Sequence, residues 1–127
     1  MARQPISTDQ APAAIGPYSQ AVRSGSLLFL SGQIPLDPAT GQLVEGDIAA
    51  QARRVFDNLK AVCIAAGAGL DSIVRVGIYV VDLGDFAAVN TVMADYFEAP
   101  YPARSTIEVS GLPRGARVEV DAILAFD

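Results

Sequence analysis

Two stretches near the end of the chain place an apolar side chain at every second position. Residues 104–109 and 117–122 both show this alternation, which predicts two strands, each with one apolar face. The segment between them, 112–115, contains proline and glycine and is typical of a turn. Arg104 and Glu119 each fall on the face opposite the apolar row of their own strand.

Earlier in the chain, residues 20–23 and 27–30 predict a hairpin that is joined by Ser24, Gly25 and Ser26. Residues 72–81 form the most apolar predicted strand. One of its faces holds Val74, Val76, Ile78 and Val80, and the other holds Gly77, Tyr79 and Val81. A strand that is apolar on both sides is expected to be covered on both sides.

Two stretches show helical rather than strand periodicity. The first begins after Asp47, a plausible N-cap, and ends at Gly67. Its apolar stripe consists of Ile48, Ala52, Val55, Leu59, Val62 and Ala66. The second is predicted to begin at Asp82, with Asp85 completing a capping box. Its stripe consists of Phe86, Val89, Met93 and Phe97.

The predicted elements follow one another as β-β-β-α-β-α-β-β, with a short extended segment within residues 1–18 as the first strand. This order predicts an α+β fold in which residues 1–127 form a single domain, with two helices covering one face of a mixed sheet. Two helices cannot cover both faces. We therefore expect the second face to meet another subunit, in agreement with a mean hydropathy of +0.34.

Charge and composition exclude several classes of function. The net charge is −5, and the nine basic residues are scattered, which argues against a nucleic-acid partner. Histidine is absent and Cys63 is the only cysteine, so the usual zinc sites and every histidine-dependent triad are excluded. No metal or cofactor is expected, although a carboxylate-only Mg²⁺ or Ca²⁺ site stays open. No apolar run approaches the roughly 18 residues that span a bilayer, and we expect a cytoplasmic protein without a membrane partner.

Arg104 and Glu119 are the candidates for chemistry. An arginine directly after Pro102-Ala103 offers a cationic fork for a carboxylate, and a glutamate nearby offers a base. From the residues alone, a solvated polar face with a surface ion pair is the favoured explanation, since exposed charges are the rule.

Motifs along nearly the whole chain resemble those of the Rid (reactive intermediate deaminase) family, also called the YjgF family. They are A-P-A-A-I-G-P-Y-S-Q at 11–20, S-G-Q-I-P-L-D-P at 31–38, Gln51 with Asn58-Leu59, D-F-A-A-V-N at 85–90, P-A-R-S at 102–105, and L-P-x-G-A-x-V-E-V at 112–120. The resemblance implies a chorismate-mutase-like fold of the bacillus type. It also implies a homotrimer around a central β-barrel, with three clefts between neighbouring subunits.

The resemblance further implies cofactor-free hydrolysis of enamines and imines, such as 2-aminoacrylate, to 2-oxo acids and ammonia. It assigns the substrate carboxylate to Arg104, which with Glu119 is the expected catalytic pair. Substrate-binding residues around the cleft would be Arg104, Tyr18, Ser31, Gly32, Asn90 and Thr106. Thr106 departs from the family, because many members have cysteine at this position.

Three other functions remain open from the sequence. The same cleft could bind small carboxylic acids without turnover, as a regulatory trimer does. A ribonuclease or translation inhibitor, a role attributed to some members of the family, is disfavoured by the acidic balance and the missing histidine. A chaperone-like surface would agree with the high apolar content. Which 2-imino acid would be preferred depends on the shape of the pocket between subunits.

Overall fold

The structure, a computed structural model, describes residues 2–127. Eight elements follow one another in the predicted order. The strands are β1 (Gln4–Ile6), β2 (Ala21–Ser24), β3 (Leu27–Gln33), β4 (Ile73–Val80), β5 (Ala103–Glu108) and β6 (Val118–Ala125), and the helices are α1 (Ile48–Ala65) and α2 (Phe86–Tyr96). Both predicted hairpin strands are present, and the second runs three residues further than expected.

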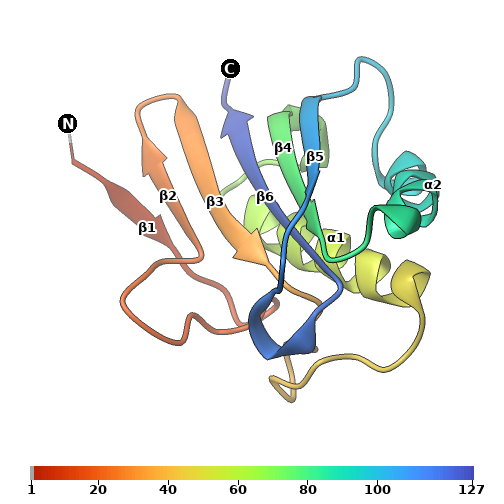
Figure 1. Ribbon diagram of the computed structural model, residues 1–127. Helices are drawn as coiled ribbons and strands as arrows, with labels where there is room; N and C mark the ends of the chain where they lie inside the picture. Colours follow the sequence, from red (N-terminus) through yellow and green to blue (C-terminus); the bar gives the residue numbers. More distant parts are fainter. Residues whose placement is uncertain (1) are drawn as a thin grey trace.

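The strands form one mixed sheet in the order β1-β2-β3-β6-β4-β5. Every neighbouring pair is antiparallel except β4 and β5, which run parallel. Both helices lie on one face of this sheet, with α1 against β3 and β6 and with α2 packed beside α1 (Figure 1). The predicted α+β fold, with two helices on one face of a mixed sheet, is thus confirmed.

The core lies between the helices and one face of the sheet. The sheet contributes fully buried side chains from its three middle strands, and α1 contributes its apolar stripe. These side chains include Leu28, Val76, Ile78, Val80, Val118, Val120 and Leu124 from the sheet, with Val55, Phe56, Leu59 and Val62 from α1. The helix begins and ends where its sequence predicts, because Asp47 Oδ1 accepts a hydrogen bond from the Ala50 amide and Gly67 adopts a positive φ of 85°.

Two polar side chains are buried within this apolar helix, and both hold backbone atoms of distant segments. Asn58 Nδ2 donates to the Leu36 carbonyl oxygen at 3.0 Å, and Gln51 Oε1 accepts from the Arg117 amide at 2.9 Å. The resulting hydrogen bonds offset the cost of burying the two amides. They also fix the loop after β3 and the start of β6 against α1.

The prediction for Val74 is wrong. Its side chain is 47% exposed, whereas Ile73 is buried in the core. The pairing of β4 with β6 shifts register between Ile73 and Arg75, and the extra residue turns the side chain of Val74 away from the helices. Beyond this irregularity the alternation is as predicted.

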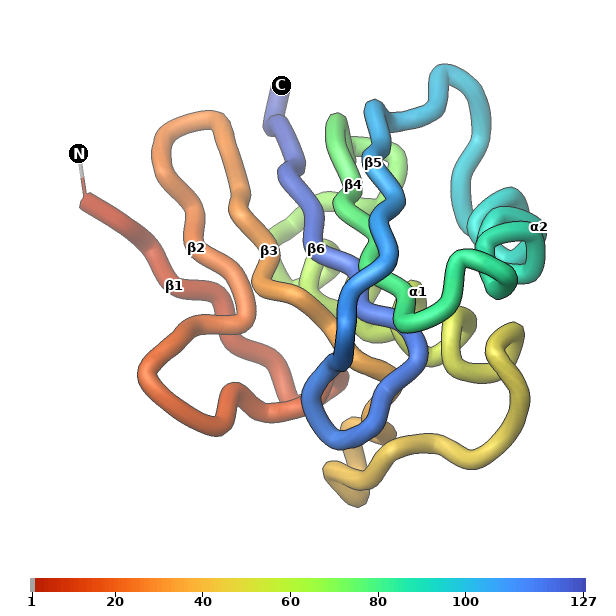
Figure 2. Tube along the Cα trace, viewed as in Figure 1, coloured from red at the N-terminus to blue at the C-terminus, as the bar shows by residue number. Residues whose placement is uncertain are grey.

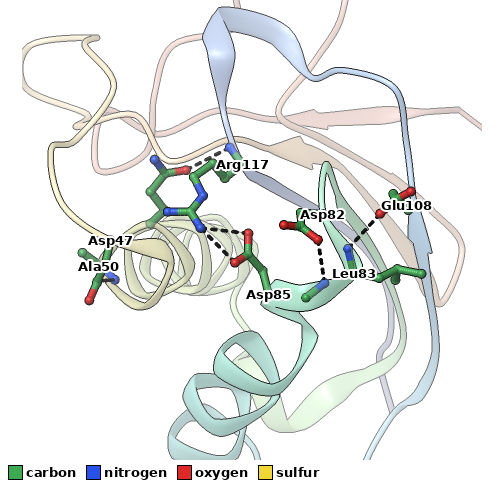
Figure 3. A network of polar contacts seen from close by, with 9 residues as sticks. Asp47, Ala50, Asp82, Leu83, Asp85, Glu108 and Arg117 are labelled. Carbon is green, nitrogen blue, oxygen red and sulfur yellow. Dashed lines mark hydrogen bonds and ion pairs between the residues drawn. The ribbon is translucent and has the colours of Figure 1, made fainter.

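The predicted capping box at the second helix is also wrong. Asp82 Oδ1 accepts from the Gly84 amide and so caps a short 3₁₀ turn, Leu83–Asp85, and not the helix itself (Figure 3). The helix begins at Phe86. Asp85 makes no cap hydrogen bond, and both of its oxygens instead accept from Arg117 Nη2, at 2.8 and 3.0 Å. The ion pair with Arg117, just before β6, therefore replaces the predicted cap.

The apolar stripe of α2 also differs in part from the prediction. Val89 and Met93 are buried as expected, and Val92 joins them. Phe97 lies one residue beyond the end of the helix and is still buried. Phe86 is 37% exposed and stands at the edge of the core. The consequence is that the first turn of α2 presents an aromatic ring outside the core.

The pair formed by Asp85 and Arg117 connects the start of α2 to the start of β6. A second link, from the Leu83 amide to Glu108 Oε1 at 2.9 Å, connects the same turn to the end of β5 (Figure 3). The side chain of Asp85 is 12% exposed and that of Arg117 is 41% exposed, so water screens this pair in part, from the arginine side. These contacts fix the position of α2 relative to β5 and β6.

We expect Asp85→Asn to lower the free energy of unfolding by about 1–2 kcal/mol, because the charge-assisted hydrogen bonds to Arg117 are lost. Chemical denaturation at neutral pH measures this. Asp95→Asn is the matched control, since it breaks the Arg53–Asp95 pair, in which both side chains are about half exposed. Equal destabilisation by the two variants would contradict the assigned role of Asp85.

Candidate functional site

Arg104 projects from β5 toward α2. Strand β5 pairs in parallel with β4, and Arg104 lies beside the buried Val76, so its side chain is on the helix-covered face of the sheet. Its Nη1 donates to Asn90 Oδ1 at 2.6 Å, and its guanidinium carbon lies 5.2 Å from the centre of the Phe86 ring. Because the amide and the ring hold one side of the guanidinium, the other nitrogens are left to bind a ligand.

A pocket of about 500 Å³ opens beside this guanidinium. Its lining consists of Asn90, Met93, Ala94, Tyr101, Pro102 and Arg104. The sulfur of Met93 lies 3.6 Å from Arg104 Nη1, and Tyr101 is 64% exposed. The pocket therefore combines one cationic group with apolar walls, which suits a small anionic ligand that has an apolar part.

Thr106 lies two residues after Arg104 on the same face of β5, beside Ile78 of β4. Its hydroxyl oxygen is buried and has no hydrogen-bond partner within residues 2–127. Buried hydroxyl groups are normally satisfied, so an unpaired one two residues from Arg104 on the same strand face is a candidate ligand-binding group, although it does not line the pocket itself.

Glu119 lies on the opposite face of the sheet, which no helix or strand within residues 2–127 covers (Figure 1). It sits between Val118 and Val120, both of which are fully buried under the helices, so its own side chain must point the other way. It faces Tyr79 across the pairing of β4 with β6. On the β3 side its carboxylate lies above Gly32.

Gly32 is the residue that makes room for this carboxylate. The pairing of β3 with β6 is irregular between Leu30 and Gln33. A Cβ at Gly32 would collide with the carboxylate of Glu119 and would lie only 2.9 Å from its Cδ. The glycine at the end of the strand thus marks both a bulge and a close approach of a side chain.

The environment of Glu119 favours its protonated form. Partial burial of the carboxyl group raises its pKa above the ordinary value of 4.5, and the negative charge of Asp121 raises it further. No hydrogen bond or ion pair reaches this carboxylate from the described residues. A half-buried carboxylate without a donor is unusual outside functional sites.

Tyr18 and Ser31 lie near Gly32. A pocket of about 240 Å³ is lined in part by Ile15, Tyr18, Gly32, Ile34 and Arg114. Tyr18 is 53% exposed, whereas the hydroxyl of Ser31 donates to the Ser19 carbonyl oxygen at 2.6 Å and thereby fixes the loop that carries Tyr18. Figure 2 shows this loop, between β1 and β2, at the same end of the sheet as the turn between β5 and β6.

The predicted site residues thus form two separate groups within one chain. Arg104, Asn90 and Thr106 lie on the helix-covered face near the β5 edge. Glu119 and Gly32 lie on the open face, with Tyr18 and Ser31 at the adjoining loop. Arg104 lines the pocket beside α2, Gly32 and Tyr18 line the pocket at the loop, and Glu119 lines neither of these two pockets. We call these two groups of candidate residues the half-sites.

Two aromatic residues near the half-sites were not identified from the sequence. Phe86 stands four residues before Asn90 on α2, and this spacing, which places both on one helix face, was the available signal. Tyr79 had no comparable signal, because its proximity to Glu119 depends on how β4 pairs with β6. Within residues 2–127 no group of three or more metal-ligating side chains is arranged to hold an ion, and no helix is long and apolar enough to cross a membrane.

Comparison with known proteins identifies the family of this chain. The family model described as Endoribonuclease L-PSP matches residues 8–126. The crystal structure of YyfA from Yersinia pestis, a protein of the conserved Rid family, superposes with a TM-score of 0.95 at 48% identity and covers 98% of this chain and 99% of its own. The chain belongs to the Rid family. The resemblance found in the sequence is thereby confirmed.

Relatives of this Rid-family chain include one protein that is named for an activity and one structure with a bound ligand. A protein named 2-iminobutanoate/2-iminopropanoate deaminase from Mus musculus is 45% identical over 95% of this chain and 90% of its own length. Protein DfrA from Myxococcus xanthus is 59% identical over 97% of this chain and 95% of its own. The structure of TdcF from E. coli with bound serine has a TM-score of 0.93 at 41% identity and covers 98% of this chain and 99% of its own.

The raised pKa of Glu119 predicts how stability depends on pH. The folded protein holds the proton of this carboxyl group more tightly than the unfolded chain does, so stability falls as pH rises from about 4.5 through the folded pKa. Glu119→Gln never ionises. We expect it to be more stable than wild type above this range and equally stable below it.

Thermal unfolding at a series of pH values and one protein concentration measures the difference. Glu98→Gln removes the same charge from an exposed position and serves as the control. If Glu119→Gln is less stable than wild type at pH 8, the carboxylate is held by a partner and the assignment is wrong.

Proposed function

We propose that this chain catalyses the cofactor-free hydrolysis of 2-imino acids and their enamine tautomers to 2-oxo acids and ammonia. The observation that carries the proposal is the Arg104 guanidinium, which Asn90 and Phe86 hold at the mouth of an otherwise mainly apolar pocket. Relatives at 44–46% identity are named 2-iminobutanoate/2-iminopropanoate deaminase, which supports the assignment. Such substrates are small acids with short apolar side chains.

Arg104 would bind the carboxylate of the substrate through two parallel hydrogen bonds, as a planar guanidinium allows. This contact fixes the position of the adjacent imine carbon, and orientation of this kind supplies much of the rate acceleration for an electrophile that already reacts with water. The unpaired hydroxyl of Thr106, on the same face of β5, is available to the bound substrate or to water.

Glu119 would act as the base. It accepts a proton from water while the water oxygen bonds to the imine carbon and the C=N π electrons move to nitrogen. The proton that Glu119 has accepted then passes to the nitrogen of the tetrahedral intermediate. The hydroxyl proton of this intermediate next passes through the same carboxylate to the nitrogen. The C=O bond of the 2-oxo acid forms as the C–N bond breaks, and ammonia leaves. A carboxyl group whose pKa is raised toward neutrality suits these transfers.

The two half-sites would meet across a subunit interface. We propose a homotrimer in which the open face of the sheet is covered and in which Arg104 of one chain approaches Glu119 of its neighbour. The open face supports this proposal because several large apolar side chains on it, or at its edge, are between 38 and 50% exposed. They are Leu27, Phe29, Val74 and Ile107. Gly32, Ser31 and Tyr18 would line the neighbour's side of the cleft.

A trimer that binds small carboxylic acids without turning them over is the second candidate. Arg104 serves binding as well as catalysis, and the relative that is 59% identical is named only protein DfrA. The description of the family model names an endoribonuclease, but the chain carries a net charge of −5 and no histidine, which does not favour RNA cleavage. A cytoplasmic location stays a prediction.

Kinetics of single variants test the proposed roles. Arg104→Ala should lower kcat/KM for freshly generated iminobutyrate by roughly ten- to a hundredfold or more, because a charge-assisted pair is lost from both ground and transition states. Arg104→Lys should restore little of it. Glu119→Gln should lower kcat by about 10²–10⁴ and should leave 2-oxobutyrate binding nearly intact.

A dehydratase-coupled assay and calorimetric titration measure these quantities. Wild-type protein that binds 2-oxobutyrate but does not accelerate ammonia release would favour the non-catalytic candidate. Normal binding by Arg104→Ala would refute the role of Arg104.

Co-expression of two inactive variants tests whether each site is shared between subunits. In a mixed trimer, a chain with Glu119→Gln still supplies Arg104, and a neighbour with Arg104→Ala still supplies Glu119. At equal expression about a quarter of wild-type activity should return, because about three quarters of the trimers contain one restored site of three. Light scattering should give three times the mass of the single chain.

Co-expression of Arg104→Ala with the double variant is the control, since no site can then contain both residues. If the mixed trimers of the two single variants remain as inactive as this control, the two residues belong to different sites.

A further inference from the structure

A polar cluster lies on the open face of the sheet, next to Glu119. Asp121 of β6 pairs with Gly77 of β4, and one of its carboxylate oxygens fills the space that a Cβ at Gly77 would take. The Tyr79 hydroxyl and Arg75 Nη1 approach the same position, at 2.9 and 3.2 Å. The glycine therefore makes room for three polar groups at one point.

Tyr79 pairs with Glu119 across β4 and β6, yet its hydroxyl does not form a hydrogen bond with Glu119. It donates to Asp121 Oδ2 at 3.1 Å. The Glu119 carboxylate receives no hydrogen bond from the part of the chain that the structure describes. Asp121 thus competes for the donor that would otherwise stabilise the ionised form of Glu119.

The charge of Asp121 acts in the same direction. Asp121 follows Glu119 by two residues on the same face of β6, which places their Cα atoms about 7 Å apart. Two carboxylates that project from neighbouring positions of one strand face disfavour each other's ionised form.

We propose that Asp121 is a positioning residue for Glu119. Asp121 binds the Tyr79 hydroxyl and so keeps this donor away from the Glu119 carboxylate, and its negative charge favours the protonated form of Glu119. The inference rests on the proposed function in so far as Glu119 is the base of the reaction. Because Asp121 shifts the equilibrium of Glu119 toward its protonated form, Glu119 gives up and accepts a proton at a pH closer to neutrality.

Other charged groups near Glu119 do not replace Asp121 in this role, and Arg104 of the neighbouring chain in the proposed trimer acts in the opposite direction, because a positive charge favours the ionised carboxylate. On β4 the neighbours are Tyr79 and Arg75, and the positive charge of Arg75 lies at the Asp121 end of the cluster. On β3 the neighbour is the uncharged Gly32. Arg117, two residues before Glu119, directs its guanidinium to Asp85. After partial burial, Asp121 is the group that raises the pKa of Glu119.

Carbon-13 NMR of the glutamate side-chain carboxyls measures the effect without any assay of activity. The chain contains only four glutamates, at 45, 98, 108 and 119, and the signal that disappears in Glu119→Gln assigns the fourth. Asp121→Asn keeps an acceptor for Tyr79 but removes the charge. We expect the titration midpoint of Glu119 to fall by roughly half a unit or more, and the acid limb of kcat/KM for imine hydrolysis to move by the same amount.

Two further variants make the result specific. Asp9→Asn removes one negative charge from the exposed N-terminal loop and should leave the midpoint of Glu119 unchanged. Tyr79→Phe removes the hydroxyl but keeps the charge of Asp121, so the midpoint should not fall. Asp121→Ser, which is smaller and uncharged, replaces Asp121→Asn if the asparagine variant does not fold, and should lower the midpoint likewise.

The outcomes separate this inference from the proposed function. An unchanged midpoint in Asp121→Asn, or an equal fall in Asp9→Asn, overturns the role of Asp121. A lowered midpoint in Asp121→Asn supports that role even if wild-type protein hydrolyses no imine, and in that case only the proposed reaction fails.

Discussion

The alternation of side chains along β6 is the constraint on which the rest of this structure depends. Because β6 lies between β3 and β4, its valines at 118 and 120 must enter the core under α1, and its acids at 119 and 121 must then stand on the open face. A one-residue slip would bury two carboxylates and expose two valines, which is far too costly to occur. Glu119 is therefore placed on the open face by the packing of its neighbours, and not by any partner of its own.

The polar residues that contact β6 serve two different purposes. Gln51 and Asp85 bind the amide and the guanidinium of Arg117, and so fix the start of the strand against both helices. These hydrogen bonds stabilise the fold. The Glu119 carboxylate, in contrast, receives no hydrogen bond from residues 2–127 and has an acid beside it, which raises its pKa. An ionised carboxylate that is poorly stabilised within its own chain is a common feature of functional sites.

The division of the site residues between two faces gives the open face a second role. An apolar surface with Phe29 and Ile107 exposed would favour aggregation in an isolated chain. In the proposed trimer the same surface would bury these side chains and bring the arginine of one chain to the glutamate of the next. Assembly and catalysis would then depend on one interface, and a chain that fails to assemble would have no complete site.

Much of this fold could be predicted from the sequence, because it follows from local periodicity and capping. The order of the elements, the ends of α1 at Asp47 and Gly67, and the opposite faces of β6 all follow from such patterns. The motifs also identified the family and hence the candidate residues. Where local rules failed, a distant segment had intervened: Asp85 bound Arg117 instead of capping α2, and a register shift against β6 turned Val74 outward. The contacts of Arg104 with Asn90, and of Asp121 with Tyr79, join residues that are 14 and 42 positions apart. Only the tertiary structure could decide them, because which side chains meet across a sheet depends on strand order and register, and these are set by the packing of the whole core.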